Sequence, residues 1–297
     1  MVNGILDELK LKYKSGNIAT KLIYINIIFF FTILIVGFVL KKIFPSFQID
    51  NIIALSSQPN ALIKHPWSIF TYAFLHGELW HLFLNMLLLY YISSMFLRYF
   101  RDQDFLTFYI LGILGGALFY CLFAGYFSSG SSYLVGSSAA IYATFFGLVS
   151  YNPKIPVRLL FFPNSFPILY IAFFLLGLDV YQIIDGRNSG GSLSHFGGAA
   201  VGYLYMKQFE KGNDFIGRTI RQVQNFFNRK KKTTFKTYSN QTKKNPYEQK
   251  VPRDDYEFNS QKVAKQQKID AILDKISRSG YESLTKEEKD FLFREGR

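Results

Sequence analysis

The chain has 297 residues and a formal net charge of +13; 18% of its residues are aromatic and only 19% are charged. Its apolar residues come in long charge-free runs, which excludes an ordinary soluble domain and predicts a membrane protein with several spans. The single cysteine, Cys121, rules out an intrachain disulfide.

The charge is unevenly distributed along the chain. Residues 1–206 contain 12 Lys and Arg against 8 Asp and Glu, whereas residues 207–297 contain 22 against 13 and so carry +9 of the net charge. This change of composition predicts a membrane domain followed by a basic cytoplasmic tail.

A polar and basic N-terminal segment, residues 1–21, precedes six apolar runs. The first run has 19 residues, enough to cross the hydrocarbon core as a helix. Residues 51–76 are too rich in proline and polar residues to cross and are expected partly in the interface. The sequence therefore predicts an all-α membrane fold, a six-helix bundle within residues 22–206, with spans at Leu22–Leu40, Leu79–Leu97, Phe105–Phe127, Leu134–Tyr151, Phe166–Ile184 and, as a short last span, Ser194–Met206.

Positive charges next to the spans indicate the orientation of this bundle. If every span crosses once, one side of the membrane contains the lysines of residues 1–21, Arg98 with Arg101, Lys154 with Arg158, and the basic tail. That side is expected to be the cytoplasm of a bacterial inner membrane, with both termini inside. Spans two, four and six then start at the outer surface, so their polar residues share one depth.

A serine lies near the start of the fourth span, in the small-residue stretch VGSSAAIYA of residues 135–143. Taken alone, Ser138 can be explained by a structural role, because a serine hydroxyl in a span often bonds the carbonyl one turn back, and the small side chain lets a neighbouring helix approach. The sixth span opens with His195 in HFGGAAVG, where Gly198 and Gly202 form a small face for tight packing. If this packing brings the imidazole to Ser138, the histidine is a candidate general base for a serine nucleophile.

The second span begins with His81 and Asn85, four residues apart and therefore on one helical face. Asn85 could instead bond a neighbouring helix, and His81 could be an interfacial anchor beside Trp80. His76, Glu78 and His81 also read H-x-E-x-x-H. The two histidines are five apart, about 140° around a helix, whereas a zinc-protease helix needs them four apart, which argues against a metal site.

Three motifs together resemble the signatures of the rhomboid family of intramembrane serine proteases: G-S-S-A-A-I-Y at residues 136–142, H-x-x-x-N at residues 81–85, and H-F-G-G-A-A-V-G at residues 195–202. They occur in the family's order and in the matching spans, and the resemblance covers residues 22–206. It implies that Ser138 attacks the scissile carbonyl and that His195 is its general base, a dyad without an acid, a metal or another cofactor.

The resemblance also implies roles for four supporting residues. Asn85, His81 and the backbone N–H of the nucleophile would surround the developing oxyanion, and Gly136 would help to shape that site. Tyr142 would pack against the catalytic histidine. Donors prearranged in a water-poor site stabilise a developing charge strongly, and loss of one typically costs about 3 kcal/mol.

The chain departs from the family pattern in two places. Family members commonly have glycine after the nucleophile, where this chain has Ala139. The tryptophan-arginine pair often seen in the first outer loop has no counterpart, because residues 51–78 contain no arginine, and this leaves the anchor of the loop undefined. Asp179 and Asp185 flank the outer end of the fifth span and could suggest a triad. Asp185 is interpreted as a solvated loop charge, and the resemblance assigns it no role.

The sequence thus predicts an intramembrane serine endopeptidase that cleaves single-span membrane proteins near the outer face of the bilayer. The fifth span is the expected movable wall for substrate access, because its start, PNSFP, is irregular. A non-catalytic relative, an adaptor or chaperone that binds client helices, is disfavoured by the presence of both Ser138 and His195. A small transporter is also disfavoured. Such a protein would carry charged residues in mid-span or broken helices around a midplane site, whereas the polar residues of this chain gather at one outer level.

The tail has two predicted parts. Residues 207–267 are basic and polar, with a cluster at residues 229–232, and are predicted to be a disordered linker that binds anionic lipids rather than nucleic acid. In residues 268–297, apolar residues recur at helical spacing, Gly280 gives a stop, and Thr285 with Glu288 forms a capping box. This small segment resembles helix pairs appended to bacterial rhomboid-like proteins and is expected to dock on an unknown partner or on the membrane domain.

Overall fold

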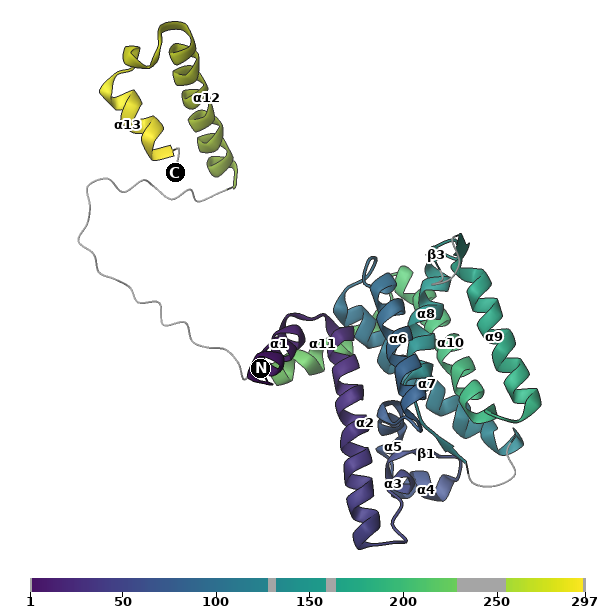
Figure 1. The fold of residues 1–297 in the computed structure, drawn as a ribbon. Coiled ribbons are helices and arrows are strands. Elements are labelled where there is room, and N and C mark those ends of the chain that lie inside the picture. Colours follow the sequence, from purple (N-terminus) through teal and green to yellow (C-terminus); the bar gives the residue numbers. More distant parts are fainter. Residues whose placement is uncertain (1, 128–131, 159–163, 229–254, 296–297) are drawn as a thin grey trace. The chain divides into compact units, whose positions relative to one another are not determined.

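The chain is mostly helical and divides into two compact units (Figure 1). The computed structural model describes residues 2–127, 132–158, 164–228 and 255–295. The first unit covers residues 1–232 and the second covers residues 233–297. Each unit is described by itself.

Six long helices, alternating in direction, make up most of the first unit (Figure 1). By length and composition, four of them can cross a membrane: α2, α6, α7 and α9. The other two are α8, which is apolar but has only 14 residues, and α10, which has 22 residues and polar ends. The six correspond in order to the six predicted spans, although the count of six crossings stays a prediction. Their bounds are Ile18–Ile43 for α2, Leu79–Phe96 for α6, Asp102–Phe127 for α7, Ser138–Tyr151 for α8, Ile168–Asp185 for α9 and Ser189–Glu210 for α10.

Two predicted boundaries are wrong, and both bear on the site. The fourth span was expected from Leu134, but this residue lies in β2 (Tyr133–Leu134), and the helix begins only at Ser138 because Gly136 has a left-handed φ of 116°. The sixth span was expected to be short, with His195 near its start. Instead α10 begins at Ser189, since its small serines and glycines are compatible with a packed helix, and at about 1.5 Å per residue it reaches roughly 33 Å.

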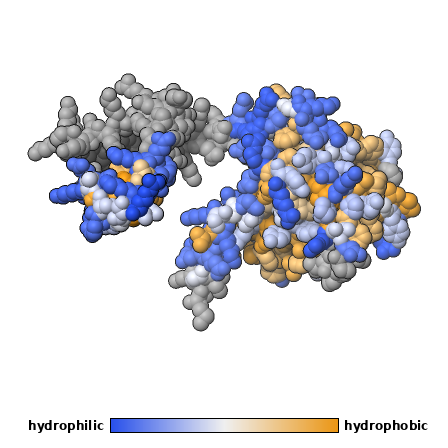
Figure 2. Space-filling view, turned by 90° about the horizontal axis from the view of Figure 1, so that it is seen from above, coloured by the Kyte–Doolittle hydropathy of each residue, from blue (hydrophilic) through white to orange (hydrophobic). Residues whose placement is uncertain are grey.

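Glycines hold α7, α8 and α10 close together at the centre of the bundle. A Cβ added at Gly112 of α7 would lie 2.6 Å from the Ala140 Cα of α8, and one at Gly202 of α10 would lie 2.6 Å from the Ala143 Cα. Such distances are far below ordinary contact, so only hydrogen fits at these positions. The outer helices differ, since large apolar side chains of α2 and α9 are exposed. Seen end-on, hydrophobic residues lie along much of the rim of this unit (Figure 2).

The connection between α2 and α6 is anchored without an arginine. Trp67 donates its indole N–H to the carbonyl oxygen of Ile52 at 2.8 Å. The strand β1 (Leu55–Ser56) pairs antiparallel with β2, and the N–H of Gly136 donates to the carbonyl oxygen of Tyr72 at 2.9 Å. The backbone before α8 is thereby fixed to this connection, whose short helices are α3 (Asp50–Ile53), α4 (Pro59–Lys64), α5 (Ser68–Thr71) and η1 (Tyr72–Phe74).

Part of the segment predicted to be a linker is helical. The helix α11 (Phe215–Asn228) follows α10 and begins at a cap, in which the Gly217 N–H donates to Asp214 Oδ1 at 3.0 Å. Arg221 forms ion pairs with Asp214 and with Asp104 of α7. The prediction rested on the basic and polar composition of this segment, and it missed that the pairing of Arg221 with Asp104 joins the helix to the bundle. The basic cluster at residues 229–232 lies outside the described residues.

The remaining elements are short or peripheral. The N-terminal segment forms α1 (Val2–Ser15), and β3 (Pro156–Arg158) pairs antiparallel with β4 (Ser165–Pro167) just before α9. In the second unit, α12 (Asp255–Ser279) begins within the predicted linker, and η3 (Tyr281–Ser283) connects it to α13 (Lys286–Glu295).

The second unit contains the stop and the capping box expected from the sequence. Gly280 ends α12 with a φ of 77°. The Thr285 N–H donates to the Glu288 carboxylate at 2.8 Å, and the Glu288 N–H donates to the Thr285 hydroxyl at 3.3 Å. Lys275 of α12 holds the same carboxylate and, as the largest cause, lowers the pKa of Glu288. Among the described residues of this unit, only Ile272 and Leu284 are buried apolar side chains, so its core is small.

Candidate active site

The serine and the histidine singled out in the sequence lie in direct contact. Ser138 is the first residue of α8, and His195 lies in the second turn of α10. Their side chains meet with Ser138 Oγ 2.7 Å from His195 Nε2. A serine hydroxyl that donates to an imidazole nitrogen can lose its proton as it attacks a carbonyl, which is the geometry needed by a serine nucleophile and its general base.

Close helix packing explains this contact. Gly198 lies one turn after His195, and a Cβ added there would lie 2.9 Å from the carbonyl carbon of Ala139, the residue that follows the nucleophile. At Gly202 the same helix meets α8 one turn further on, at Ala143. The two glycines therefore let α10 approach the start of α8, which sets the distance between the imidazole and the hydroxyl.

Tyr142 holds one face of the imidazole. It lies one turn after Ser138 on α8, and its ring stacks on that of His195 with centroids 4.2 Å apart and an interplanar angle of 18°. This contact restricts rotation of the imidazole about its χ2 torsion. Tyr142 thus lies where the family resemblance implied.

Potential donors for an oxyanion surround the start of α8. The first N–H groups of a helix have no partner within the helix, so the backbone N–H of Ser138 can bind a negatively charged oxygen. His81 lies over Gly136, where an added Cβ would come within 2.9 Å of its Cε1 and Nε2 atoms. Position 136 therefore favours glycine for two reasons: its left-handed φ, and the nearby His81 ring, which an added Cβ would meet.

Asn85 is fixed by two hydrogen bonds. It donates from Nδ2 to the carbonyl oxygen of His81 at 2.9 Å and accepts at Oδ1 from the Ser137 hydroxyl at 3.3 Å. Its nitrogen carries two N–H groups, so it can still donate to a charged oxygen in the adjacent cavity. The bond to Ser137 also joins α6 to α8, so the structure supports the helix-bonding interpretation of Asn85 as well.

A carboxylate contacts the imidazole of the predicted dyad. His195 Nδ1 lies 2.7 Å from Oδ1 of Asp179, a residue of α9 that is only 1% exposed. From the sequence, Asp179 and Asp185 could suggest a triad, but a dyad was predicted, since a single apolar run does not reveal which side of α9 faces α10. A charged residue inside an apolar helix was the available signal. Asp185, in contrast, pairs with Arg187 at the end of the same helix.

A cavity of about 640 Å³ opens beside Ser138 and His195. Its volume is within the range of small-molecule and peptide sites. Apolar side chains from α6, α8 and α9 form most of its walls, among them Leu84, Leu88 and Leu175, and the polar residues of the site line the same space. An apolar segment that presents one carbonyl to Ser138 would match such a lining.

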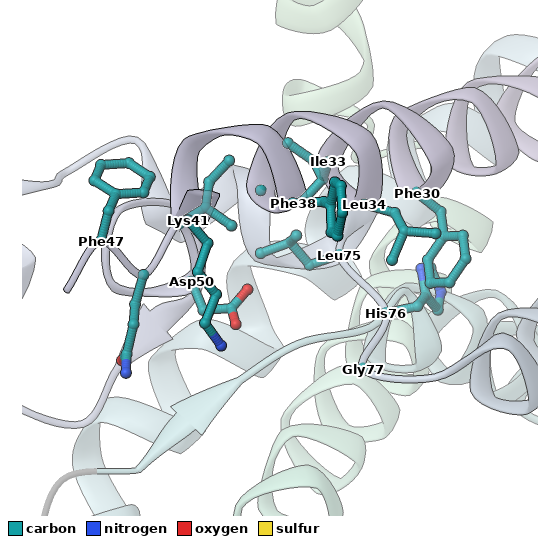
Figure 3. A pocket seen from close by; sticks show the side chains of 13 residues that line it. Phe30, Ile33, Leu34, Phe38, Lys41, Phe47, Asp50, Leu75, His76 and Gly77 are labelled. Carbon is teal, nitrogen blue, oxygen red and sulfur yellow. The ribbon is translucent and has the colours of Figure 1, made fainter. Parts of the chain in front are cut away.

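The H-x-E-x-x-H residues do not converge. His76 lies before α6, in a groove of about 360 Å³ between this connection and α2, where it sits beside Phe30 while Lys41 and Asp50 occupy the other end (Figure 3). Its ring is 5.2 Å from that of His81, edge to face. Burial, with His81 as a weaker cause, lowers the pKa of His76 to about 4. Among the described residues, no three His, Cys, Asp or Glu side chains are placed to hold a metal ion.

Comparisons with known proteins match both units to families. A family model for the rhomboid domain matches residues 64–209, which include every residue of this site, and a family of unknown function (DUF6576) matches residues 254–294. The chain is also 28% identical over 189 residues to RHOMBOID-like protein 12, mitochondrial, of Arabidopsis thaliana. The match covers 59% of this chain and 55% of the relative, so the chain spans about half the length of the curated relative it matches. With these motifs, apolar helices and matches, residues 64–209 form a rhomboid domain, and the chain is a multi-pass integral membrane protein.

Proposed function

We propose that this protein is an intramembrane serine endopeptidase. The observation that carries the proposal is the 2.7 Å contact of Ser138 Oγ with His195 Nε2, at the start of a helix and at the edge of an apolar cavity. Non-catalytic relatives would need neither group in this arrangement, and a transporter would not need a serine at a helix N-terminus.

The geometry supports a two-step acyl transfer. Ser138 Oγ attacks the peptide carbonyl carbon while its proton moves to His195 Nε2, and the oxyanion is held by the Ser138 N–H, Asn85 and His81. The imidazole then gives its proton to the amide nitrogen, the C–N bond breaks, and an acyl-serine remains. A water molecule, deprotonated by His195, attacks the acyl carbon, and the proton returns to Ser138 Oγ as the second product leaves.

Substrates are proposed to be single-span membrane proteins that unwind near the outer surface. The site lies at the N-terminal ends of α8 and α10, which face outward if both termini of the chain are cytoplasmic. Three residues of α9 are buried, namely Ile168, Ala172 and Asp179, so this helix is held less firmly than α8 and is the proposed movable wall. Cross-linking α9 to α6 through engineered cysteines, after replacement of Cys121, is expected to abolish cleavage.

The experiment that tests the function is cleavage of a single-span reporter panel in membranes. The wild type, Ser138→Ala and His195→Ala are compared at equal expression. The control is Ser94→Ala, since the Ser94 hydroxyl donates to the Tyr91 carbonyl oxygen within α6, away from the site. Cleavage by the wild type and by the control, lost in the other two, supports the proposal. Cleavage that survives Ser138→Ala contradicts it. If the wild type cleaves nothing and a fluorophosphonate does not label Ser138, the client-binding alternative is favoured.

A further inference from the structure

The family resemblance assigns no function to a carboxylate, yet one lies buried beside the proposed base. Asp179 is one of three buried residues of α9, and the other two, Ile168 and Ala172, are apolar. A charged side chain within an apolar span is costly unless a partner compensates for it. Half of the residues of α9 are exposed, so many other positions on this helix would have left a carboxylate nearer to water. Its burial against α10 therefore indicates a specific partner.

The partner is the imidazole of His195. Asp179 Oδ1 lies 2.7 Å from His195 Nδ1, while Nε2 on the other side of the ring lies 2.7 Å from Ser138 Oγ. An ionised carboxylate can only accept hydrogen bonds, so Nδ1 must carry the proton in this contact. In a neutral imidazole the other nitrogen is then bare, and a bare Nε2 is what the serine hydroxyl needs as its acceptor.

Two contacts together define the position of the ring. Tyr142 covers one face of the imidazole, and Asp179 binds its edge. Because Asp179 comes from α9 and Tyr142 from α8, the imidazole is held between two helices other than its own. Asp185 lies six residues later on α9, outside this arrangement. It pairs with Arg187, and the side chain of Asp185 is 29% exposed. It is a matched control for a change of charge on the same helix.

We propose that Asp179 is a positioning residue, which fixes the tautomer and the orientation of His195 so that a bare Nε2 faces Ser138. The consequence for catalysis rests on the proposed function. The assignment of the tautomer does not, because it follows from the contact of an ionised Asp179 with Nδ1. The site is then a serine–histidine–aspartate triad whose acid comes from the helix proposed to move for substrate access.

Kinetics of Asp179→Asn test the catalytic part. The amide can donate an N–H to Nδ1, which forces the imidazole proton onto Nε2 and removes the acceptor for Ser138. We expect kcat to fall by about 10²- to 10⁴-fold with little change in KM, because the amide disables the base and keeps nearly the same size and shape in the cavity wall. Asp179→Ala, which imposes neither tautomer, should lose less activity, and Asp185→Asn should stay within about twofold of the wild type. Equal rates for Asp179→Asn and the wild type would overturn the proposal.

A second readout needs no activity. Nitrogen-15 NMR of the purified, histidine-labelled protein reports which ring nitrogen is protonated, and the four histidines of the chain can be assigned by their loss in single variants. We expect a protonated Nδ1 for His195 in the wild type and a protonated Nε2 in Asp179→Asn. The same tautomer in both proteins would overturn the inference. If the tautomer changes as expected but the wild type cleaves no reporter, the inference stands and the proposed function fails.

Discussion

A single methyl group at Gly198 should separate the two reacting groups. In Gly198→Ala the new Cβ would lie 2.9 Å from the Ala139 carbonyl carbon, whereas ordinary carbon–carbon contacts are about 3.5–4.0 Å. This contact is with backbone, so α10 must move away from α8 by about 1 Å. His195 moves with α10, which lengthens its 2.7 Å contact with Ser138 beyond a good hydrogen bond. A displacement of about 1 Å can cost roughly 100-fold in rate.

The assay is the initial rate of reporter cleavage in membranes, with variants matched in amount. Gly177→Ala on α9 is the control, because an added Cβ there meets nothing within 4 Å. We expect Gly198→Ala to lose about 100-fold in rate and Gly177→Ala to behave as the wild type. Gly202→Ala should separate the same helices one turn further from His195 and therefore reduce the rate less. A Gly198→Ala variant with wild-type activity would refute the argument that glycine packing sets the distance.

Three other predictions concern the surroundings of the site. Asn85→Ala should lower kcat by about 10²- to 10³-fold if Asn85 binds the oxyanion; a lower melting temperature with an unchanged kcat would show a packing role instead. The pKa of His76 is about 4 in the folded protein and about 6.5 in the unfolded chain, so the unfolded chain binds the proton more readily. The free energy of unfolding should therefore fall by about 3 kcal/mol as the pH drops from 6.5 to 4. Melting in detergent should show this loss in the wild type and not in His76→Phe. Arg221→Ala leaves Asp104 and Asp214 without this cation, so we expect faster hydrogen exchange in α11 with unchanged cleavage; unchanged exchange would contradict a role of this ion pair.

The sequence was sufficient for the features that depend on local pattern. Apolar runs located the six helices of the bundle, because a membrane-spanning helix must be predominantly apolar. The pairing of Ser138 with His195 could be inferred because both lie in stretches of small residues, which allow helices to approach closely. The capping box of Thr285 and Glu288 is equally local, since both partners lie within one turn.

Features that depend on helix rotation or on distant partners could not be predicted. Asp179 binds His195 only because α9 turns one side towards α10, and no periodic pattern within the apolar run marks that side. The true length of α10 was missed because its ends are polar although still helical. The helix α11 was predicted to be part of a linker because the segment is basic and polar, whereas Arg221 is paired with Asp104, more than 100 residues earlier in the chain.

The most direct test of the central claim is fluorophosphonate labelling of the protein in membranes, with the modified residue located by mass spectrometry. We expect a label on Ser138 in the wild type and none on the neighbouring Ser137, which is buried and bonded to Asn85. Labelling should be lost in His195→Ala, because the hydroxyl then has no base. A label on another residue, or labelling of Ser138 at the same rate without His195, would contradict a nucleophile activated by this histidine.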